Sequence, residues 1–330
     1  MRRIYIDERW YNLGGIGTFA NSINAINNYD ELRLNGSPVS PIDCIRLSWR
    51  LLKIKDGVVF LPGYIPPLFS TVPYVFTIHD LNHLDRKENS TLFKRFFYNL
   101  IIKNGCKKAK YIFTVSEFSK ERIVEWAKIS PDKVINVGNG VSEEFTSRGE
   151  KMSFDFPYIL CVSNRKGHKN ELGTLKAFSK SSIDSSVKLV FTGEPDSDIL
   201  RNIRELSLEN RVLFTGRVKS QDLPKLYRSA SALIFVSFYE GFGLPVIEAQ
   251  ASGVPVITSG STALREIAGD GAVIVNPFDI DEISDGINRV LNGSDIFINE
   301  LIQKGHKNCE RYSWRKTAII IEKHLRNLCK

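Results

Sequence analysis

The sequence predicts an α/β protein with two doubly wound parallel sheets in succession. Short, β-branched and nearly continuous apolar runs recur along the chain, as expected of strands buried on both faces. Helical patterns separate several of these runs, and strand–helix alternation is typical of a parallel sheet covered by helices. The length of 330 residues exceeds that of an ordinary single core and suits two domains.

The first half contains five of the apolar runs. A glycine-rich bend, Gly14 to Gly17, follows the first run, and a helix is predicted from about Thr18. A second helix is predicted over residues 119–128. The strands are expected at residues 4–6, 57–61, 74–78, 111–115 and 133–137.

The second half begins after a polar segment without periodicity, residues 141–156, which we interpret as an interdomain linker. Strands are then expected at residues 158–162, 188–192, 212–214, 232–236, 255–257 and 272–275. The final helical segment, 314–328, is long enough to return to the first half. The predicted domains are therefore residues 1–148 and 149–311, with residues 312–330 forming the returning helix.

Composition narrows the classes of partner and site. The chain has 45 basic and 37 acidic side chains, a net charge of +8, which favours nucleotide phosphates, an anionic membrane surface or nucleic acid as partners without selecting one. The five cysteines form no Cys-x-x-Cys pair, which indicates reduced thiols and argues against disulfides and structural zinc. No segment has the apolar length of a membrane span or a signal peptide, so we expect a cytoplasmic protein.

The densest motif spans residues 237–249 and follows a predicted strand. Its glycines, Gly241 and Gly243, allow main-chain N–H groups to approach a ligand closely. A helix beginning at Pro245 would offer its amino terminus to a diphosphate. Glu240 precedes the loop and Glu248 lies about one turn into the helix, so both can flank one pocket. If the glycine turn stood alone, a tightly packed strand-to-helix turn with solvated glutamates would be the better explanation.

The segment 251–257 directly downstream completes a pattern that resembles the retaining family-4 glycosyltransferases, which have the GT-B fold. The hallmark of that family is two glutamates separated by seven residues, and Glu240 and Glu248 reproduce it. The resemblance runs through the whole chain and is strongest in the second half. It implies two Rossmann-like doubly wound domains that face an interdomain cleft.

The resemblance also assigns roles in the second half. Residues 162–170 are similar to the family's phosphate-binding segment, which implies that Arg165 and Lys169 hold the donor diphosphate, although Lys166 could replace Arg165. Asn164 of the same segment is a further donor-binding candidate. Glu248 is expected at the ribose hydroxyls and Glu240 at the transferred sugar. The remaining donor-binding candidates are Gly216 and Arg217 at the base, and the main chain of Phe242, Gly243 and Leu244 at sugar or phosphate oxygens.

The first half contributes fewer candidates. His79 closes a predicted strand; a single histidine is more often structural, but related family members carry one here near the donor sugar. Gly15 and Gly17 match the family's first glycine loop, where donor phosphates and the acceptor approach. Together, His79, Glu240, Lys169 and Arg165 are the expected catalytic residues, and we expect no metal ligands.

Residues 93–98, in which aromatic and basic side chains alternate, lead into Lys103, Lys107, Lys108 and Lys110. This pattern suits a helix that leans on anionic lipid at the inner face of the inner membrane. A core-facing helix with a basic outer face explains it equally well, and the sequence does not decide between the two.

The resemblance implies a hexosyltransferase that uses a nucleotide-sugar donor and retains the anomeric configuration. The implied acceptor is a glycan or lipid-linked glycan in bacterial polysaccharide or O-antigen biosynthesis. The first choice of donor is GDP-mannose, and a dTDP- or UDP-sugar giving a rhamnosyl- or glucosyl-type transferase is the alternative. No metal or other cofactor is expected, and nucleic acid is not an expected partner.

Three other classes compete with this interpretation. A GT-B nucleotide-sugar epimerase would need carboxylates that assist elimination at C2, and the sequence identifies none. An NAD-dependent oxidoreductase would need Gly-x-Gly-x-x-Gly after a strand, which is missing. A non-catalytic nucleotide-binding module predicts loss of Glu240, Glu248 or Lys169, and all three are present.

Overall fold

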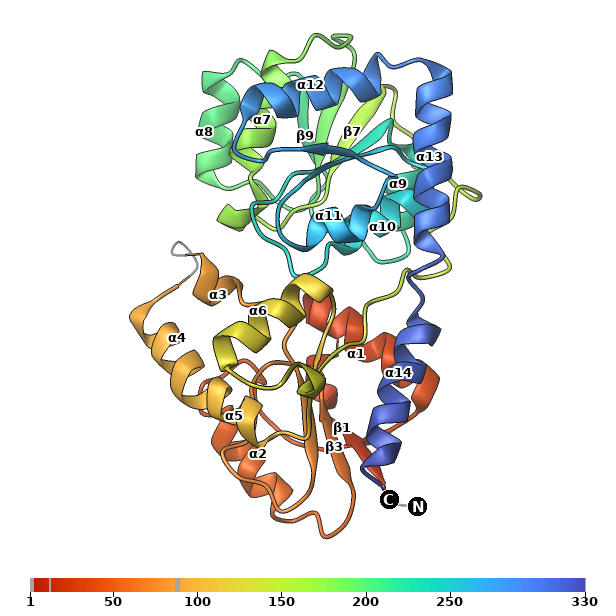
Figure 1. The fold of residues 1–330 in the computed structure, drawn as a ribbon. Coiled ribbons are helices and arrows are strands. Elements are labelled where there is room, and N and C mark those ends of the chain that lie inside the picture. The colour runs from red at the N-terminus through yellow and green to blue at the C-terminus, as the bar shows by residue number, and fades with distance from the viewer. Residues whose placement is uncertain (1–2, 12, 87–89, 330) are drawn as a thin grey trace. The chain divides into compact units, whose positions relative to one another are not determined.

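The structure is a computed structural model that describes residues 3–11, 13–86 and 90–329 (Figure 1). Its contacts divide the chain into two compact units. One unit contains the chain up to Gly140 and the segment from Ser313 onward, and the other is Val141–Tyr312. The second unit thus begins at residue 141, earlier than the boundary at 148 that the sequence predicts. Arg228 ties the segment after 141 to this unit, because it donates hydrogen bonds to the carbonyls of Glu144 (2.9 Å) and Glu150 (2.8 Å).

The first unit contains a six-stranded sheet in the order β2-β1-β3-β4-β5-β6, and every neighbouring pair is parallel. The five predicted strands are confirmed. The strand β2 was not predicted because its two residues show no apolar pattern, and both are exposed in the structure. The strands are β1 (Ile4–Ile6), β2 (Asp30–Glu31), β3 (Val58–Leu61), β4 (Tyr74–Thr77), β5 (Tyr111–Thr114) and β6 (Val134–Asn136).

Helices cover both faces of this sheet. Side chains of α2, α5 and α6 enter one core cluster with the strands, whereas Phe19 of α1 packs edge-on against Phe60 of β3 and against Trp314 of α14. The helices are α1 (Gly14–Asn27), α2 (Asp43–Leu51), α3 (Asn82–Asp85), α4 (Leu92–Phe97), α5 (Lys103–Lys108), α6 (Glu117–Ala127) and α14 (Trp314–Asn327). A π-helical segment, Tyr98–Ile102, joins α4 to α5.

The helix α1 corrects one prediction, because it begins at Gly14 rather than near Thr18. The glycines therefore form its first turn instead of a preceding bend. Gly14 has a φ of +60°, which only glycine adopts without strain, and a Cβ at Gly14 or Gly15 would meet nothing within 4 Å. The first turn of α1 thus leaves open space beside its main chain.

The final helix, α14, packs against α1 in the first unit (Figure 1). The Tyr29 hydroxyl donates to Glu322 Oε2 at 2.6 Å, and Asn27 Nδ2 donates to the Ala318 carbonyl at 3.1 Å. A Cβ on Gly140 would lie 2.1 Å from the main-chain nitrogen of Trp314, so only glycine at position 140 allows this close approach to α14.

The second unit contains a six-stranded parallel sheet in the order β12-β11-β10-β7-β8-β9. All six predicted strands are present. They are β7 (Tyr158–Cys161), β8 (Lys188–Phe191), β9 (Val212–Phe214), β10 (Ala232–Phe235), β11 (Val256–Ser259) and β12 (Val273–Val275). The helices are α7 (Glu171–Lys180), α8 (Ser197–Glu205), α9 (Leu223–Ser229), α10 (Leu244–Ala251), α11 (Ala263–Ala268), α12 (Ile280–Leu291) and α13 (Asp295–Cys309).

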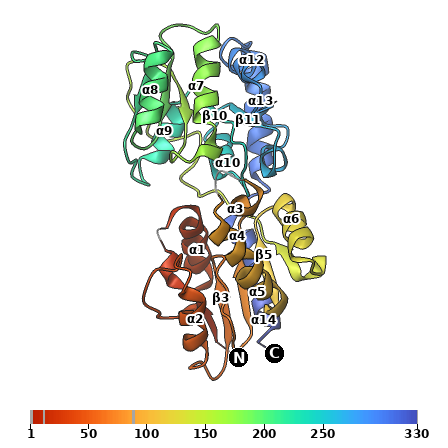
Figure 2. The ribbon, with the colours of Figure 1, turned by 90° about the vertical axis from the view of Figure 1, so that its left-hand side faces the viewer.

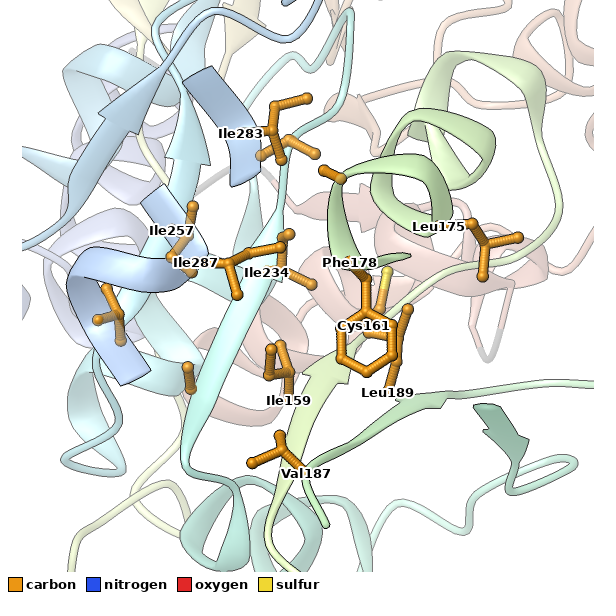
Figure 3. Close-up of a cluster of buried hydrophobic side chains, with 14 of the residues drawn as sticks. Ile159, Cys161, Leu175, Phe178, Val187, Leu189, Ile234, Ile257, Ile283 and Ile287 are labelled. Carbon is orange, nitrogen blue, oxygen red and sulfur yellow. The ribbon is translucent and has the colours of Figure 1, made fainter. Parts of the chain in front are cut away.

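Two apolar layers cover this second sheet. On one face, Leu175 and Phe178 of α7 and Ile283 and Ile287 of α12 pack on the strands (Figure 3). On the other face, α9, α10 and α11 supply the cluster. Burial of each such side chain stabilises the fold by about 1.5–3 kcal/mol. The two layers cover the faces of the sheet, so that loops occupy its carboxyl edge.

Candidate active site

The loop after β7 positions Lys169. The loop ends in a short 3-10 turn, Gly167–Lys169, and Lys169 Nζ lies 2.7 Å from Glu240 Oε1. Both side chains are only slightly exposed, at 15% and 13%. The ammonium also lies 4.7 Å from the centre of the Phe235 ring, on β10. Residues 71 positions apart thus form a mostly buried ion pair at the carboxyl ends of β7 and β10.

The loop after β10 positions Glu240. The Glu240 main-chain N–H donates to Thr262 Oγ1 at 3.0 Å. Thr262 has a φ of +54°, a strained conformation for a β-branched residue, and such strain concentrates at functional sites. Gly243 has a φ of +110°, and a Cβ there would lie 2.4 Å from Leu264 Cδ2. The loop therefore needs glycine at 243 to reach α10, which begins at Leu244 with Pro245 in its first turn.

Glu248 lies one turn into α10 and accepts a 2.8 Å hydrogen bond from the Tyr227 hydroxyl. Burial raises the pKa of the Glu248 carboxyl to about 7, and the Tyr227 hydrogen bond opposes that rise. Burial and the adjacent Glu248 also raise the pKa of Tyr227 well above its ordinary value. Near physiological pH, the neutral and the charged form of the Glu248 carboxyl are therefore both populated.

Arg165 has structural partners. Its guanidinium donates to Glu171 Oε1 at 2.6 Å, to the Glu194 carbonyl at 3.0 Å and to the Thr192 carbonyl. It also lies between the Phe191 and Phe214 rings, 5.1 Å from the centre of each. Glu171 thus neutralises the charge that the sequence analysis expected at the donor diphosphate, and a diphosphate role for Arg165 stays a prediction.

The other expected donor-binding residues of the second unit lie in its loops. Asn164 and Arg217 are exposed, and Phe242 is 5% exposed and packs edge-on against Tyr312. Gly216 has a φ of +64°, and its carbonyl accepts a 2.8 Å hydrogen bond from the Gly193 N–H. Leu244 is the first residue of α10. These residues and the Lys169–Glu240 pair belong to one unit, whereas His79, Gly15 and Gly17 belong to the other.

His79 directly follows β4 and is held by the backbone. Its Nε2 lies 2.9 Å from the Pro62 carbonyl, and its ring meets the Phe19 ring edge-on at 5.0 Å. Because a carbonyl oxygen only accepts, the Nε2 atom carries the hydrogen. Burial lowers the pKa of His79 to about 4. His79 is therefore a neutral imidazole whose Nδ1 is the remaining acceptor.

We expect His79 to stay neutral throughout the physiological pH range. In a proton NMR titration, its Cε1–H resonance, assigned by comparison with His79→Gln, should move only near pH 4. Turnover between pH 5.5 and 8 should accordingly show no step that disappears in His79→Gln. A midpoint near the ordinary value of about 6.5 would contradict this electrostatic description.

Two contacts of this site escaped the sequence analysis. Tyr227 lies in α9, and its bond to Glu248 joins residues 21 positions apart. Thr262 supports Glu240 from 22 positions away, and no sequence pattern marks a threonine with positive φ. Spacing along the chain does not reveal such contacts.

Known proteins resemble both the sequence and the fold. The family model for glycosyl transferases group 1 matches residues 143–308, and that for glycosyltransferase family 4 matches residues 33–145. O-antigen chain mannosyltransferase B from Escherichia coli is 28% identical over 284 residues, which cover 82% of this chain and 74% of that protein. The serotype-specific mannosyltransferase WbdA from Escherichia coli is 27% identical over 264 residues, which cover 74% of this chain but only 32% of the longer WbdA.

A solved structure agrees with these sequence matches. WaaG, described as a glycosyltransferase involved in lipopolysaccharide biosynthesis, superimposes with a TM-score of 0.79 at 12% identity, covering 98% of this chain and 99% of WaaG. That likeness establishes the two-sheet GT-B fold, and the two family models together span most of the chain. The chain is therefore a glycosyltransferase, and it belongs to the group 1, family 4 glycosyltransferases of GT-B fold.

Proposed function

We propose that this glycosyltransferase transfers mannose from GDP-mannose, with retention of anomeric configuration, to a glycan or lipid-linked glycan in bacterial O-antigen biosynthesis. The names of the relatives support the sugar and the pathway, since O-antigen chain mannosyltransferase B and WbdA are both mannosyltransferases. The observation that carries the chemistry is the Lys169–Glu240 pair beside the amino terminus of α10.

In the proposed reaction, the bond between the anomeric carbon and the diphosphate oxygen breaks as the bond to the acceptor oxygen forms on the same face. The departing phosphate takes the acceptor proton. Lys169 stabilises the negative charge that develops on the diphosphate, and Glu240 accepts hydrogen bonds from the sugar hydroxyls. Because Lys169 supplies that charge, we also propose that transfer needs no divalent metal.

The ionisation of Glu248 fits a role at the ribose. A charged carboxylate accepts two hydrogen bonds from vicinal hydroxyls, and the Tyr227 hydroxyl fixes its orientation at 2.8 Å. A bound ribose would therefore favour the charged form and lower the raised pKa of Glu248.

The function is tested in two steps. A thermal-shift screen of GDP, UDP, dTDP and ADP identifies the nucleotide, because a ligand that binds only the folded protein raises its melting temperature. Proton NMR of the product formed from GDP-mannose, with and without EDTA, then gives the anomeric configuration and the metal requirement. A β-mannoside, or stabilisation by none of the nucleotides, would overturn the proposal.

We further propose that the first unit contacts an anionic membrane. A helical stretch runs through α4 and α5 in the first unit (Figure 2). It exposes Leu92 (88%), Phe93 (61%), Phe96 (64%) and Leu100 (47%) on one helical face, while Tyr98 and Ile102 are buried. The first unit has 25 basic and 14 acidic side chains, against 20 and 23 in the second. Exposed apolar side chains on a basic unit suit an anionic interface. Within the described residues, no helix is long and apolar enough to cross a membrane.

The double change Phe93→Ser and Phe96→Ser should weaken binding to vesicles containing phosphatidylglycerol at least tenfold, because it removes two exposed aromatic side chains from the interface. Cosedimentation at low and high salt measures the effect. Ile296→Ser, at a position 75% exposed in the second unit, is the matched control and should bind normally. Unchanged binding by the double variant would refute the membrane contact.

A further inference from the structure

The second unit contains a cavity beside the Lys169–Glu240 pair. Its volume is about 700 Å³, within the range of roughly 300–1,000 Å³ that is usual for small-molecule sites. It lies among the loops that follow β7, β8 and β12 and the first turns of α7 and α8. Lys169, Glu240 and Glu248 do not line it, whereas Arg165 and Lys166 of the loop after β7 do.

One wall of the cavity is an aromatic platform. The Phe278 ring stacks on the Phe238 ring with centres 4.8 Å apart and planes 24° apart, and Phe278 is still 66% exposed. The platform is fixed in place, because the Phe238 N–H donates to the His168 carbonyl at 2.8 Å and Asn170 Nδ2 donates to the Pro277 carbonyl at 2.8 Å. A rigid, exposed aromatic face suits the C–H face of a sugar ring.

The rim of the cavity mixes both signs of charge. Its charged residues are Arg165, Lys166, Lys176 and Arg201 on the basic side and Glu171, Asp196 and Asp198 on the acidic side. Ion pairs join Arg165 to Glu171 and Arg201 to Asp198. An anion would lie beside the carboxylates, and a cation beside the ammonium and guanidinium groups, so each would meet repulsion. A neutral ring with several hydroxyls can use donors and acceptors together. The mixed rim therefore selects a neutral carbohydrate over a nucleotide or a phosphate.

The cavity shares two loops with the expected reaction centre. Lys166 lines the cavity and Lys169 pairs with Glu240 from the same loop, while Phe238 and Glu240 are two residues apart on the other loop. We propose that this cavity binds a neutral sugar unit of the acceptor glycan, away from the unit that is glycosylated. The identification of the sugar as part of the acceptor rests on the proposed function.

Equilibrium binding tests the cavity without requiring turnover. The full-length protein is titrated with mannopentaose by ligand-observed NMR, and separately with GDP. Phe278→Ala should raise the dissociation constant for mannopentaose about fivefold, which corresponds to roughly 1 kcal/mol, and leave that for GDP unchanged. Ile296→Ala, another exposed apolar position of this unit that lies outside the cavity, should change neither.

Kinetics then connects the cavity to the acceptor. Phe278→Ala should keep the wild-type kcat/KM for a monosaccharide acceptor and lose about fivefold for a pentasaccharide. Equal mannopentaose affinity in wild type and variant, absence of mannopentaose binding, or a loss of GDP affinity would each overturn the inference. Absence of transfer by the wild type would contradict the proposed function instead, while Phe278-dependent binding would still support the cavity.

Discussion

Lys169→Ala should lower kcat roughly 100- to 1,000-fold, the usual cost of removing one group that stabilises charge in the transition state. Lys169 Nζ is the cation that pairs with Glu240 at 2.7 Å. Charge on the leaving diphosphate develops only as the glycosidic bond breaks, so the loss should fall on kcat more than on KM. Steady-state kinetics with a saturating donor measures this difference.

Three controls accompany that measurement. Lys180→Ala removes an exposed lysine of α7 and should leave turnover unchanged. Lys166→Ala tests whether this neighbouring cation, rather than Arg165, which pairs with Glu171, meets the donor diphosphate. A melting curve separates catalysis from folding, because Lys169→Ala leaves Glu240 unpaired and should also lower stability. Near-normal turnover of Lys169→Ala would remove the proposed leaving-group role.

Glu248→Gln should weaken nucleotide binding roughly tenfold or more while making the protein more stable above neutral pH. The affinity falls because a neutral amide replaces a charged acceptor at the ribose. The stability rises because burial holds the carboxyl pKa at about 7, well above the ordinary 4.5, so ionisation is costly in the folded state. The Tyr227 hydroxyl, which donates to Glu248 at 2.8 Å, can still donate to the amide oxygen of glutamine, so the substitution keeps its hydrogen-bond acceptor.

The pH dependence follows from the sign of that shift. Since the folded pKa of Glu248 exceeds the unfolded one, its contribution to stability is fully present below pH 4.5 and is lost as the pH rises to about 7. Urea unfolding of both proteins from pH 4.5 to 8 should therefore show similar stability at the acidic end. At pH 8, Glu248→Gln should be more stable by up to about 3 kcal/mol. A difference that is independent of pH would contradict the raised pKa.

Local sequence was sufficient to predict nearly all strands of both sheets, because buried parallel strands require continuous apolar runs. The run Ala232 to Val236, for example, became β10 (Ala232–Phe235), and every pairing in both sheets is parallel. The two-residue β2 carried no such pattern and was missed. The spacing of Glu240 and Glu248 likewise indicated the family before any geometry was known, because a strand, a glycine turn and a helix determine that spacing locally.

The partners of charged groups could not be predicted in this way. Arg165 resembled a diphosphate ligand in the sequence, but Glu171, two carbonyls and the rings of Phe191 and Phe214 surround its guanidinium in the structure. His79 was expected near the donor sugar, and only the structure shows that the Pro62 carbonyl and burial hold its ring neutral. Glu171 comes from the start of α7, and the other neighbours come from other strands and loops.

The sequence by itself thus determined the two-sheet architecture, the glycosyltransferase family and the identity of the acidic pair. Only the tertiary structure decided that Lys169 pairs with Glu240, that burial raises the pKa of Glu248 to about 7 and that Phe278 stacks on Phe238. Apolar periodicity acts over a few neighbouring residues and can be read along the chain. Ion pairing and desolvation instead depend on residues that come together only when distant segments pack.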